Sequence, residues 1–195
     1  YSLNKNKIDL SETLKELSSI ESFFHGKSSG LDPLTSYLNS PIIVDSKKNL
    51  KKLDKTLINS SHDNKGFFLI DTKISSKTQP LVDFFLNKLK DVSYKKSFEN
   101  KFIKSTNNCI KFFLKNDQTN LFSEMKFLSA STLNLFNKMI PESFKNLWIY
   151  CLDSKDVALK LCGSGGGGYI MGYSIDLKKT IKELCDYNIK PINFE

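Results

Sequence analysis

The sequence contains no arginine, since all 29 of its basic residues are lysines. Proteins that bind nucleic acids commonly use arginine, whose planar guanidinium group makes paired hydrogen bonds to guanine and stacks on bases. The net charge of +8 is also spread along the chain rather than gathered in one basic segment. Both features argue against a nucleic-acid partner. A codon bias that favours Lys, Asn, Ile and Phe together accounts for the composition without implying a function.

Metal-binding and disulfide patterns are missing as well. No Cys-x-x-Cys pair occurs, and neither His25 nor His62 lies at a metal-binding spacing from a cysteine. Each cysteine stands in an apolar stretch, which predicts buried thiols in a reducing compartment. The four cysteines are Cys109, Cys151, Cys162 and Cys185.

Long hydrophobic runs are also absent. Apolar segments such as residues 67–70 are too short to cross a bilayer, and the first residues lack the basic-then-apolar pattern of a signal peptide. The sequence therefore predicts a cytoplasmic protein without a membrane partner. Because the first residue is Tyr1 rather than methionine, we expect that further chain precedes it.

The spacing of apolar residues predicts an α+β fold. A helix is expected from residue 10 to residue 26 with Ser11 as its N-cap, and a short helix to residue 39 with Asp32 as N-cap and Pro33 in the first turn. The other predicted helices cover residues 78–90, 94–115, 120–139, a short segment around Trp148, and residues 176–186. The predicted strands cover residues 41–44, 67–70, 157–162, 169–173 and about 190–194.

A change in character just before Gly66 predicts a domain boundary there, giving domains of residues 1–64 and 65–195. The lysine-rich residues 47–55 are expected to form a solvated connection or a sheet edge. The succession of elements in the second domain predicts a sandwich whose helices cover one face of a sheet.

Residues 163–168 hold five of the nine glycines of the chain. Glycine loses more backbone entropy on folding than any other residue, so such a run is expected where the backbone must approach something closely. A simple hairpin needs only two turn residues. One interpretation is a nest of backbone N–H groups that faces a phosphate or an adjoining phosphate loop, and the other is a flexible turn. No Gly-Lys-Ser/Thr follows, so this is not a Walker A motif.

A second cluster spans residues 21–33. The carboxylates of Glu21 and Asp32 bracket a loop rich in glycine and serine that joins two predicted helices, so they could converge on one point. At a helix N-terminus the dipole would favour an ionised Asp32, as a base or a metal ligand requires. Alternatively, Asp32 only caps the helix.

Together the two clusters resemble signature motifs of the GHMP kinase superfamily, most closely those of mevalonate kinases. In the first motif, a Glu is followed by His-Gly-x-Pro-Ser-Gly-x-Asp, and the matching residues are Glu21, His25, Gly26, Ser29, Gly30 and Asp32. In the last, Lys-Leu-Thr-Gly-Ala-Gly-Gly-Gly-Gly is matched by Lys160, Leu161, Gly163 and residues 165–168. Residues 71–78 are similar to a substrate-side loop of mevalonate kinases. The resemblance covers essentially the whole chain.

The resemblance implies the end of an N-terminal GHMP kinase domain over residues 1–64 and a ferredoxin-like C-terminal domain with extra helices over residues 65–195. It implies ATP and Mg²⁺ as cofactors and a small-molecule acceptor, with a homodimer as one alternative for the assembly. Asp32 would act as the base or electrostatic partner for the acceptor hydroxyl, and Glu21 would bind magnesium. The remaining implied site residues are His25, Ser29 and Thr78 toward the acceptor, and Gly163, Ser164, Gly165, Gly166 and Gly167 toward the phosphates.

The sequence departs from the family pattern at several positions. Ser28 replaces a usual Pro, Cys162 a usual Thr, Ser164 a usual Ala, and Pro33 a usual Asn. Ser76 stands where mevalonate kinases can carry an Arg near the substrate, which removes a candidate partner for the mevalonate carboxylate. Lys73 or Lys77 could take that role.

The family's Pro-x-x-x-Gly-Leu-Gly-Ser-Ser phosphate loop does not occur in the chain. We therefore expect a kinase whose present segment is inactive alone. The leading hypothesis is a mevalonate kinase that forms 5-phosphomevalonate for isoprenoid synthesis. The alternatives are a GHMP kinase for another hydroxy acid or a sugar, and a non-catalytic binding module on the same fold. The presence of both Glu21 and Asp32 argues against the last.

Overall fold

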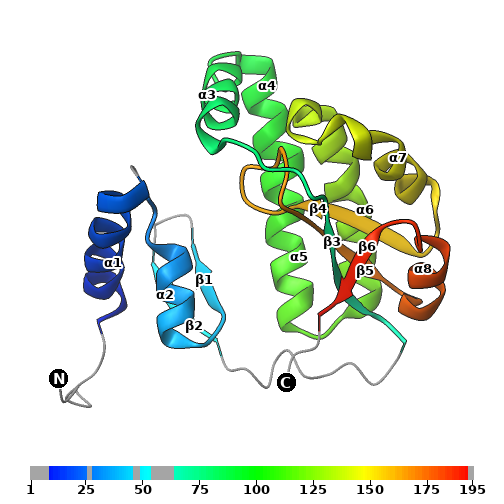
Figure 1. The fold of residues 1–195 in the computed structure, drawn as a ribbon, viewed down its shortest axis with the longest axis horizontal. Helices are drawn as coiled ribbons and strands as arrows, with labels where there is room; N and C mark the ends of the chain where they lie inside the picture. The colour runs from blue at the N-terminus through cyan, green and yellow to red at the C-terminus, as the bar shows by residue number, and fades with distance from the viewer. Residues whose placement is uncertain (1–8, 26–27, 46–48, 54–63, 193–195) are drawn as a thin grey trace. The chain divides into compact units, whose positions relative to one another are not determined.

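The computed structural model describes residues 9–25, 28–45, 49–53 and 64–192. The chain divides into two compact units, Tyr1–Asn59 and Ser60–Glu195, shown as ribbons in Figure 1. The assignment of residues 1–64 and 65–195 to two kinase domains stays a prediction.

The first unit contains two helices and a hairpin, α1 (Leu10–His25), α2 (Leu31–Leu38), β1 (Ile42–Val44) and β2 (Leu50–Lys52). The strands pair antiparallel with Ile43 opposite Lys51, so this part of the lysine-rich segment is a sheet edge. The N-cap of α1 is Asp9 and not Ser11 as predicted. The Asp9 carboxylate accepts hydrogen bonds from the N–H groups of Ser11 and Glu12, at 2.8 and 3.1 Å, and a carboxylate serves this role as well as a serine hydroxyl.

Helix α2 begins earlier than predicted. Its N-cap is Gly30, in a left-handed conformation with φ of 73°, so Asp32 and Pro33 both lie within the first turn and Asp32 is not the cap. Leu34 in this helix is fully buried. The helix ends at the left-handed Asn39, close to the predicted end.

The second unit is built on an antiparallel sheet with the strand order β4-β5-β3-β6. Its strands are β3 (Gly66–Asp71), β4 (Val157–Leu161), β5 (Tyr169–Ser174) and β6 (Asn188–Pro191). Strand β3 lies between β5 and β6, with Phe68 opposite Gly172 on one side and Pro191 on the other. The predicted α+β class is confirmed. The end of the last predicted strand, residues 193–194, lies outside the described residues.

The predicted helices of the second unit all form, but two differ in detail. The expected helix over residues 94–115 contains a π-helical turn, and the one expected to end at residue 139 ends at Leu135. The helical elements are α3 (Thr78–Lys88), α4 (Val92–Ser97), π-helix η2 (Phe98–Ile103), α5 (Lys104–Leu114), α6 (Gln118–Leu135), the 3₁₀ turns η3 (Asn137–Met139) and η4 (Glu142–Phe144), α7 (Lys145–Asp153) and α8 (Leu177–Glu183).

Helices cover both faces of this sheet, so the prediction of a one-sided sandwich is wrong. Successive residues of a strand point to opposite faces, and β3 places Phe67 and Phe68 in two different hydrophobic clusters. The cluster on the Phe68 face includes Trp148 of α7, which is fully buried and donates its indole N–H to the Ser129 carbonyl at 3.2 Å. The cluster on the Phe67 face includes residues of α5 and α6.

The cysteines are all free thiols, but they are not all buried as predicted. Burial raises the pKa of Cys109 and Cys151 to about 12, so neither is a reactive thiolate at neutral pH. Cys162 is half-buried, and Cys185, which follows the end of α8, is exposed although its neighbour Leu184 is buried in the core. Among the described residues, no helix is both long enough and apolar enough to cross a membrane.

Two aspartates cap helices of the second unit and should give its stability an acid dependence. The hydroxyl of Ser93 and the N–H of Tyr94 hydrogen-bond to Asp91, and the side chain and N–H of Asn120 hydrogen-bond to Asp117. These bonds hold the pKa of both carboxyls below the ordinary value of 3.8. A depressed pKa contributes stability that is present above the unfolded pKa and is lost as the pH falls through the folded one.

We therefore expect the free energy of unfolding to decrease as the pH is lowered below about 4. An Asp91→Asn/Asp117→Asn variant, which keeps an N-cap side chain, should show a smaller decrease over this range. Urea titrations at a series of pH values measure both slopes. Equal slopes for the variant and the unchanged protein would contradict the assignment.

Candidate functional site

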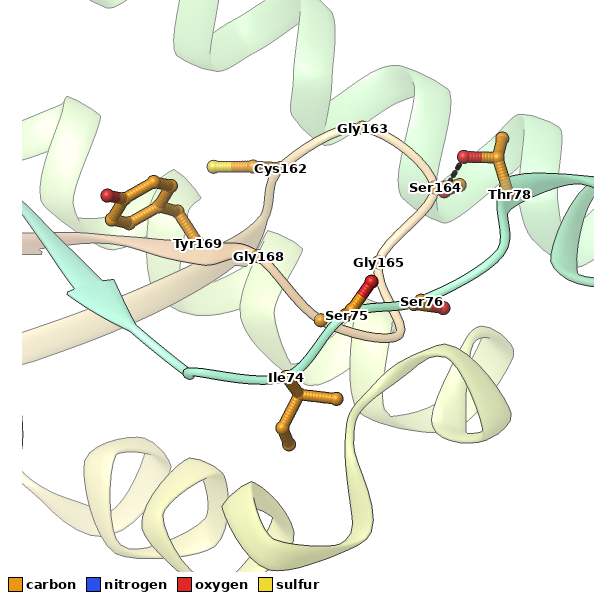
Figure 2. A pocket seen from close by; sticks show the side chains of 11 residues that line it. Ile74, Ser75, Ser76, Thr78, Cys162, Gly163, Ser164, Gly165, Gly168 and Tyr169 are labelled. Carbon is orange, nitrogen blue, oxygen red and sulfur yellow. Dashed lines mark hydrogen bonds between the residues drawn. The ribbon is translucent and has the colours of Figure 1, made fainter.

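The glycine loop between β4 and β5 borders a pocket of about 410 Å³ in the second unit. Figure 2 shows the loop bending from Cys162 through Gly163 and Ser164, with the segment that follows β3 beside it. The other side of the pocket is formed by Ile74, Ser75, Ser76 and Thr78, and Tyr169 at the start of β5 also lines it. The structure thus brings together the predicted residue Thr78 and the predicted phosphate-side residues Gly163, Ser164, Gly165 and Gly167.

Backbone hydrogen bonds fix this loop to its surroundings. The N–H of Gly166 donates to Met139 O at 2.6 Å, and the N–H of Gly168 donates to Ile74 O at 2.8 Å. The carbonyl of Gly168 in turn accepts from both the N–H and the hydroxyl of Thr72, at 2.9 and 2.8 Å. Hydrogen bonds at Gly166 and Gly168 to residues far away in the sequence argue against the flexible turn that the sequence left open as an alternative.

The close packing of the loop explains why it is made of glycine. A Cβ added at Gly167 would lie 2.4 Å from Ile74 O, and one added at Gly165 would lie 2.6 Å from Met139 O. At Gly166 the added atom would lie 2.3 Å from the Ser76 hydroxyl oxygen. A side chain at Gly166 or Gly167 would push the loop away from residues 74–76, and one at Gly165 would push it away from Met139.

The hydrogen bonds also show which donors of the predicted nest are free. Gly165, Gly166 and Gly168 donate within the protein. In the part of the chain that the structure describes, the N–H groups of Gly163, Ser164 and Gly167 have no acceptor. These three amides are therefore the candidate anion donors, and the set differs from the sequence prediction by the loss of Gly165 and Gly166.

Ser164 and Thr78 meet at one end of the pocket. Figure 2 shows the two side chains facing each other, and the Ser164 hydroxyl donates to Thr78 Oγ1 at 3.4 Å, a long contact. Thr78 is the first residue of α3. An exposed hydroxyl pair at a helix start can donate to an anion or position an acceptor hydroxyl.

The charged groups beside the pocket are already paired in part. Lys73 forms an ion pair with Asp71 at 2.9 Å, and Lys190 lies 3.7 Å from the same carboxylate. The hydrogen bond and charge of Lys73 lower the pKa of Asp71, with Lys190 adding to the effect. Of the two lysines considered as substitutes for the family arginine, Lys73 is therefore engaged, and Lys77 is the exposed residue before α3.

In the first unit, Ser28 ties the predicted metal ligand Glu21 into the turn between α1 and α2. The Ser28 hydroxyl donates to Glu21 Oε2 and accepts from the N–H of Gly30 at 3.0 Å. The carbonyl of Ser28 accepts from the Ser18 hydroxyl at 2.8 Å. Ser28 was identified in the sequence only as a departure from the family's Pro, and nothing in the spacing of residues predicted this hydrogen bond.

The other predicted residues of this unit lie around the same turn. Ser29 accepts a long hydrogen bond from the N–H of Leu31 at 3.4 Å, and Asp32 occupies the first turn of α2. His25 is the last residue of α1, but its side chain lies outside the described part, as does Gly26. The roles predicted for these residues therefore stay predictions.

No group of three or more His, Cys, Asp or Glu side chains is placed to hold a metal among the described residues. Magnesium in phosphate-transfer sites is usually bound through one or two carboxylates, with water and phosphate oxygens completing the shell. The hydrogen bonds of the described residues engage Glu21 through Oε2 alone. A single carboxylate held in one orientation fits that mode of binding.

Substitutions in the glycine loop should separate close packing from backbone conformation. Gly167→Ala should cost the Gly168 amide at least about tenfold in hydrogen-exchange protection, because the new methyl group displaces Ile74 O, the acceptor of that amide. Gly163→Ala should reduce this protection less than Gly167→Ala does, since an added Cβ there meets nothing within 4 Å and leaves the Ile74 acceptor in place. Exchange monitored by NMR measures both. Equal loss in the two variants would mean that the loop is not held by packing against Ile74.

The fold described above is shared with a solved small-molecule kinase structure. This is the mevalonate kinase from L. major in complex with R-mevalonate, with a TM-score of 0.67 and 15% sequence identity over 95% of the present chain. No protein-family model and no curated protein sequence matches the chain. At this identity the likeness concerns the fold alone, and this fold agrees with the one that the motifs predicted. The chain spans 58% of the length of that mevalonate kinase.

Proposed function

We propose that the protein containing this chain is an ATP- and Mg²⁺-dependent kinase that phosphorylates an alcohol group of a small molecule. We further propose mevalonate as the acceptor, with 5-phosphomevalonate as the product. The observation that carries the proposal is the fold, which matches a mevalonate kinase over 95% of the chain. The sequence motifs around Glu21, Asp32 and the glycine loop support it independently.

Each proposed residue has a role that phosphoryl transfer requires. This reaction needs an acceptor in line with the transferred group and donors for its equatorial oxygens, and it leaves little covalent work to the protein. Asp32 takes the proton of the acceptor hydroxyl or stabilises its developing charge. Thr78 orients the acceptor, together with His25 and Ser29. The free amides of Gly163, Ser164 and Gly167 hydrogen-bond to phosphate oxygens.

Glu21 is the proposed magnesium ligand. When bound, magnesium would supply positive charge that offsets the charge of the phosphate groups. The Ser28 hydroxyl, which donates to Glu21 Oε2, would hold the carboxylate in one orientation for the metal. The role of Ser28 is therefore to position the ligand.

The arrangement of the second unit supports the proposed domain assignment. Its strands and helices alternate as strand, helices, strand, strand, helix, strand, and the sheet order is β4-β5-β3-β6. A ferredoxin-like sheet has its first and third strands in the centre, as β3 and β5 are here. We propose that this unit is the C-terminal domain of the kinase, with α4, η2 and α5 as part of the additional helices.

Ser76 is the observation that favours a different acceptor within the same class. The family arginine would face a mevalonate carboxylate, whereas the Ser76 hydroxyl packs against Gly166. An arginine side chain on the same backbone would also crowd the loop, so the loop and residue 76 are matched to each other. A sugar or another hydroxy acid is therefore the second candidate acceptor.

The test is ATP consumption by the full-length protein with Mg²⁺ and a panel of mevalonate, phosphomevalonate and simple sugars. Turnover with mevalonate supports the full proposal. Turnover with another acceptor alone would keep the kinase and discard mevalonate. The absence of turnover with every acceptor would favour the non-catalytic binding module. The 195-residue chain assayed alone should show no turnover, and detectable phosphorylation by it would contradict the need for a separate phosphate loop.

A further inference from the structure

A second cavity of about 450 Å³ lies in the second unit, next to the glycine loop. It shares Gly163 and Ser164 with the pocket described above, but most of its wall is hydrophobic. Four phenylalanines line it, and their ring centroids lie 4.7 to 6.0 Å apart in the contacts between them. The four are Phe85, Phe98, Phe102 and Phe136.

The π-helix η2 shapes this cavity. It carries Phe98 and Phe102, whose rings stack with centroids 5.6 Å apart and an interplanar angle of 18°. Phe102 also makes an edge contact with Phe136 at 4.7 Å. A π-helical turn is rare and is commonly found where a helix contributes to a functional site. Here it lies between α4 and α5 and presents both rings to the same cavity.

Within the described part of the second unit, Lys160 is the one charged residue that lines the cavity. Its ammonium donates to Leu161 O at 3.0 Å, and no carboxylate of the described residues lies within 4.0 Å of it. The hydroxyl protons of the two threonines in the wall already form hydrogen bonds with the backbone. Thr106 donates to Phe102 O, and Thr132 donates to Leu128 O. Burial removes part of the hydration of this ammonium group, and no ion pair compensates for the lost hydration energy.

We propose that this cavity binds a small apolar carboxylate. The hydrocarbon part would lie among the phenylalanine rings, and the carboxylate would pair with Lys160. An ammonium has three protons, of which one is used on Leu161 O, so two remain for the two carboxylate oxygens. A single cation favours a monoanion over a phosphate dianion. The inference concerns binding alone and does not depend on the proposed kinase activity.

Octanoate and 1-octanol are suitable probes, because they differ mainly in charge. The chain has three methionines, and only Met139 lines the cavity, so its methyl signal reports occupancy in a protein labelled at methionine methyl groups. Met125 in the core beside α5 serves as an internal reference. Octanoate should shift the Met139 signal in a saturable way and bind about tenfold more tightly than 1-octanol, because only octanoate pairs with the ammonium.

Three variants of the 195-residue chain, one of them a control, make the test decisive. Lys160→Leu should abolish the preference for octanoate while 1-octanol still binds, and the matched control Lys155→Leu, at an exposed lysine, should keep it. Val82→Trp, which adds bulk to the wall, should weaken both ligands. Circular dichroism verifies that each variant is folded. No shift of Met139 with either probe, or equal affinity for the two probes in the unchanged chain, would overturn the proposal.

Discussion

Replacing Asp32 with asparagine in the full-length protein should lower kcat by about 10²- to 10⁴-fold, the usual contribution of a general base. Asparagine has the same shape but neither accepts a proton nor carries the charge that favours a developing alkoxide. Asp32 lies within the first turn of α2 and is not the N-cap, so the substitution removes no capping hydrogen bond. The free energy of unfolding should therefore fall by no more than about 1 kcal/mol, from the loss of a negative charge in the first turn of the helix.

The measurement is steady-state turnover together with thermal unfolding of the same preparations. Asp186→Asn, at an exposed aspartate outside both candidate sites, is the matched control and should leave kcat unchanged. If Asp32→Asn retained kcat within about threefold, the aspartate would not be the base, although the kinase assignment could stand. A loss of kcat accompanied by an equal loss in the control would instead indicate a general loss of folded protein.

Most helices and strands could be predicted because their apolar periodicity agrees with the final burial. Strand β3 is an example, since residues 67–70 are apolar on both faces and the sheet is covered on both. The same run should have ruled out a sheet with helices on one face only. The π-helix η2 could not be predicted, because its sequence continues the helical pattern of its neighbours and contains no local signal for an inserted residue.

The N-cap residues were less predictable than the helices that they begin. Asp9 and Ser11 are both good N-cap residues, and sequence alone does not rank two such residues two positions apart. At α2, the preference for Asp and Pro at a helix start pointed to Asp32, whereas the left-handed Gly30 begins the helix earlier. In that case tertiary contact with α1 decided the start.

The candidate site was predicted by motif, but its hydrogen bonds were not. The spacing of the glycines identified the loop. Only the structure shows that the N–H groups of Gly166 and Gly168 donate hydrogen bonds to Met139 O and Ile74 O. These acceptors lie 27 and 94 positions away in the sequence from their donors. Contacts over such separations depend on the assembled fold, so local patterns do not contain them.

Replacing Gly30 with alanine should destabilise the first unit by about 3 kcal/mol or more, from left-handed backbone strain and overpacking together. At φ of 73°, a Cβ would lie 2.7 Å from Leu14 O and 2.8 Å from Ser18 N, both of them backbone atoms of α1. Backbone within a helix yields little, so α2 would have to move away from α1. The Ser28 bridge to Glu21 begins two residues before this position, and Asp32 follows two residues after it.

Hydrogen exchange in α1 and α2 of the 195-residue chain measures this loss, and turnover of the full-length variant should fall although neither carboxylate has been replaced. Gly163→Ala, followed by hydrogen exchange in β4 and β5 of the second unit, is the matched control, because it also places alanine at a positive φ, 57°, but meets no atom within 4 Å. Its cost should be limited to about 1 to 2 kcal/mol of backbone strain. If both variants lost equal stability, the close approach of α2 to α1 would contribute nothing to the free energy of unfolding. Greater loss at Gly30 would mean that the absence of a side chain at this position lets α2 approach α1, and that this approach fixes the positions of Glu21 and Asp32.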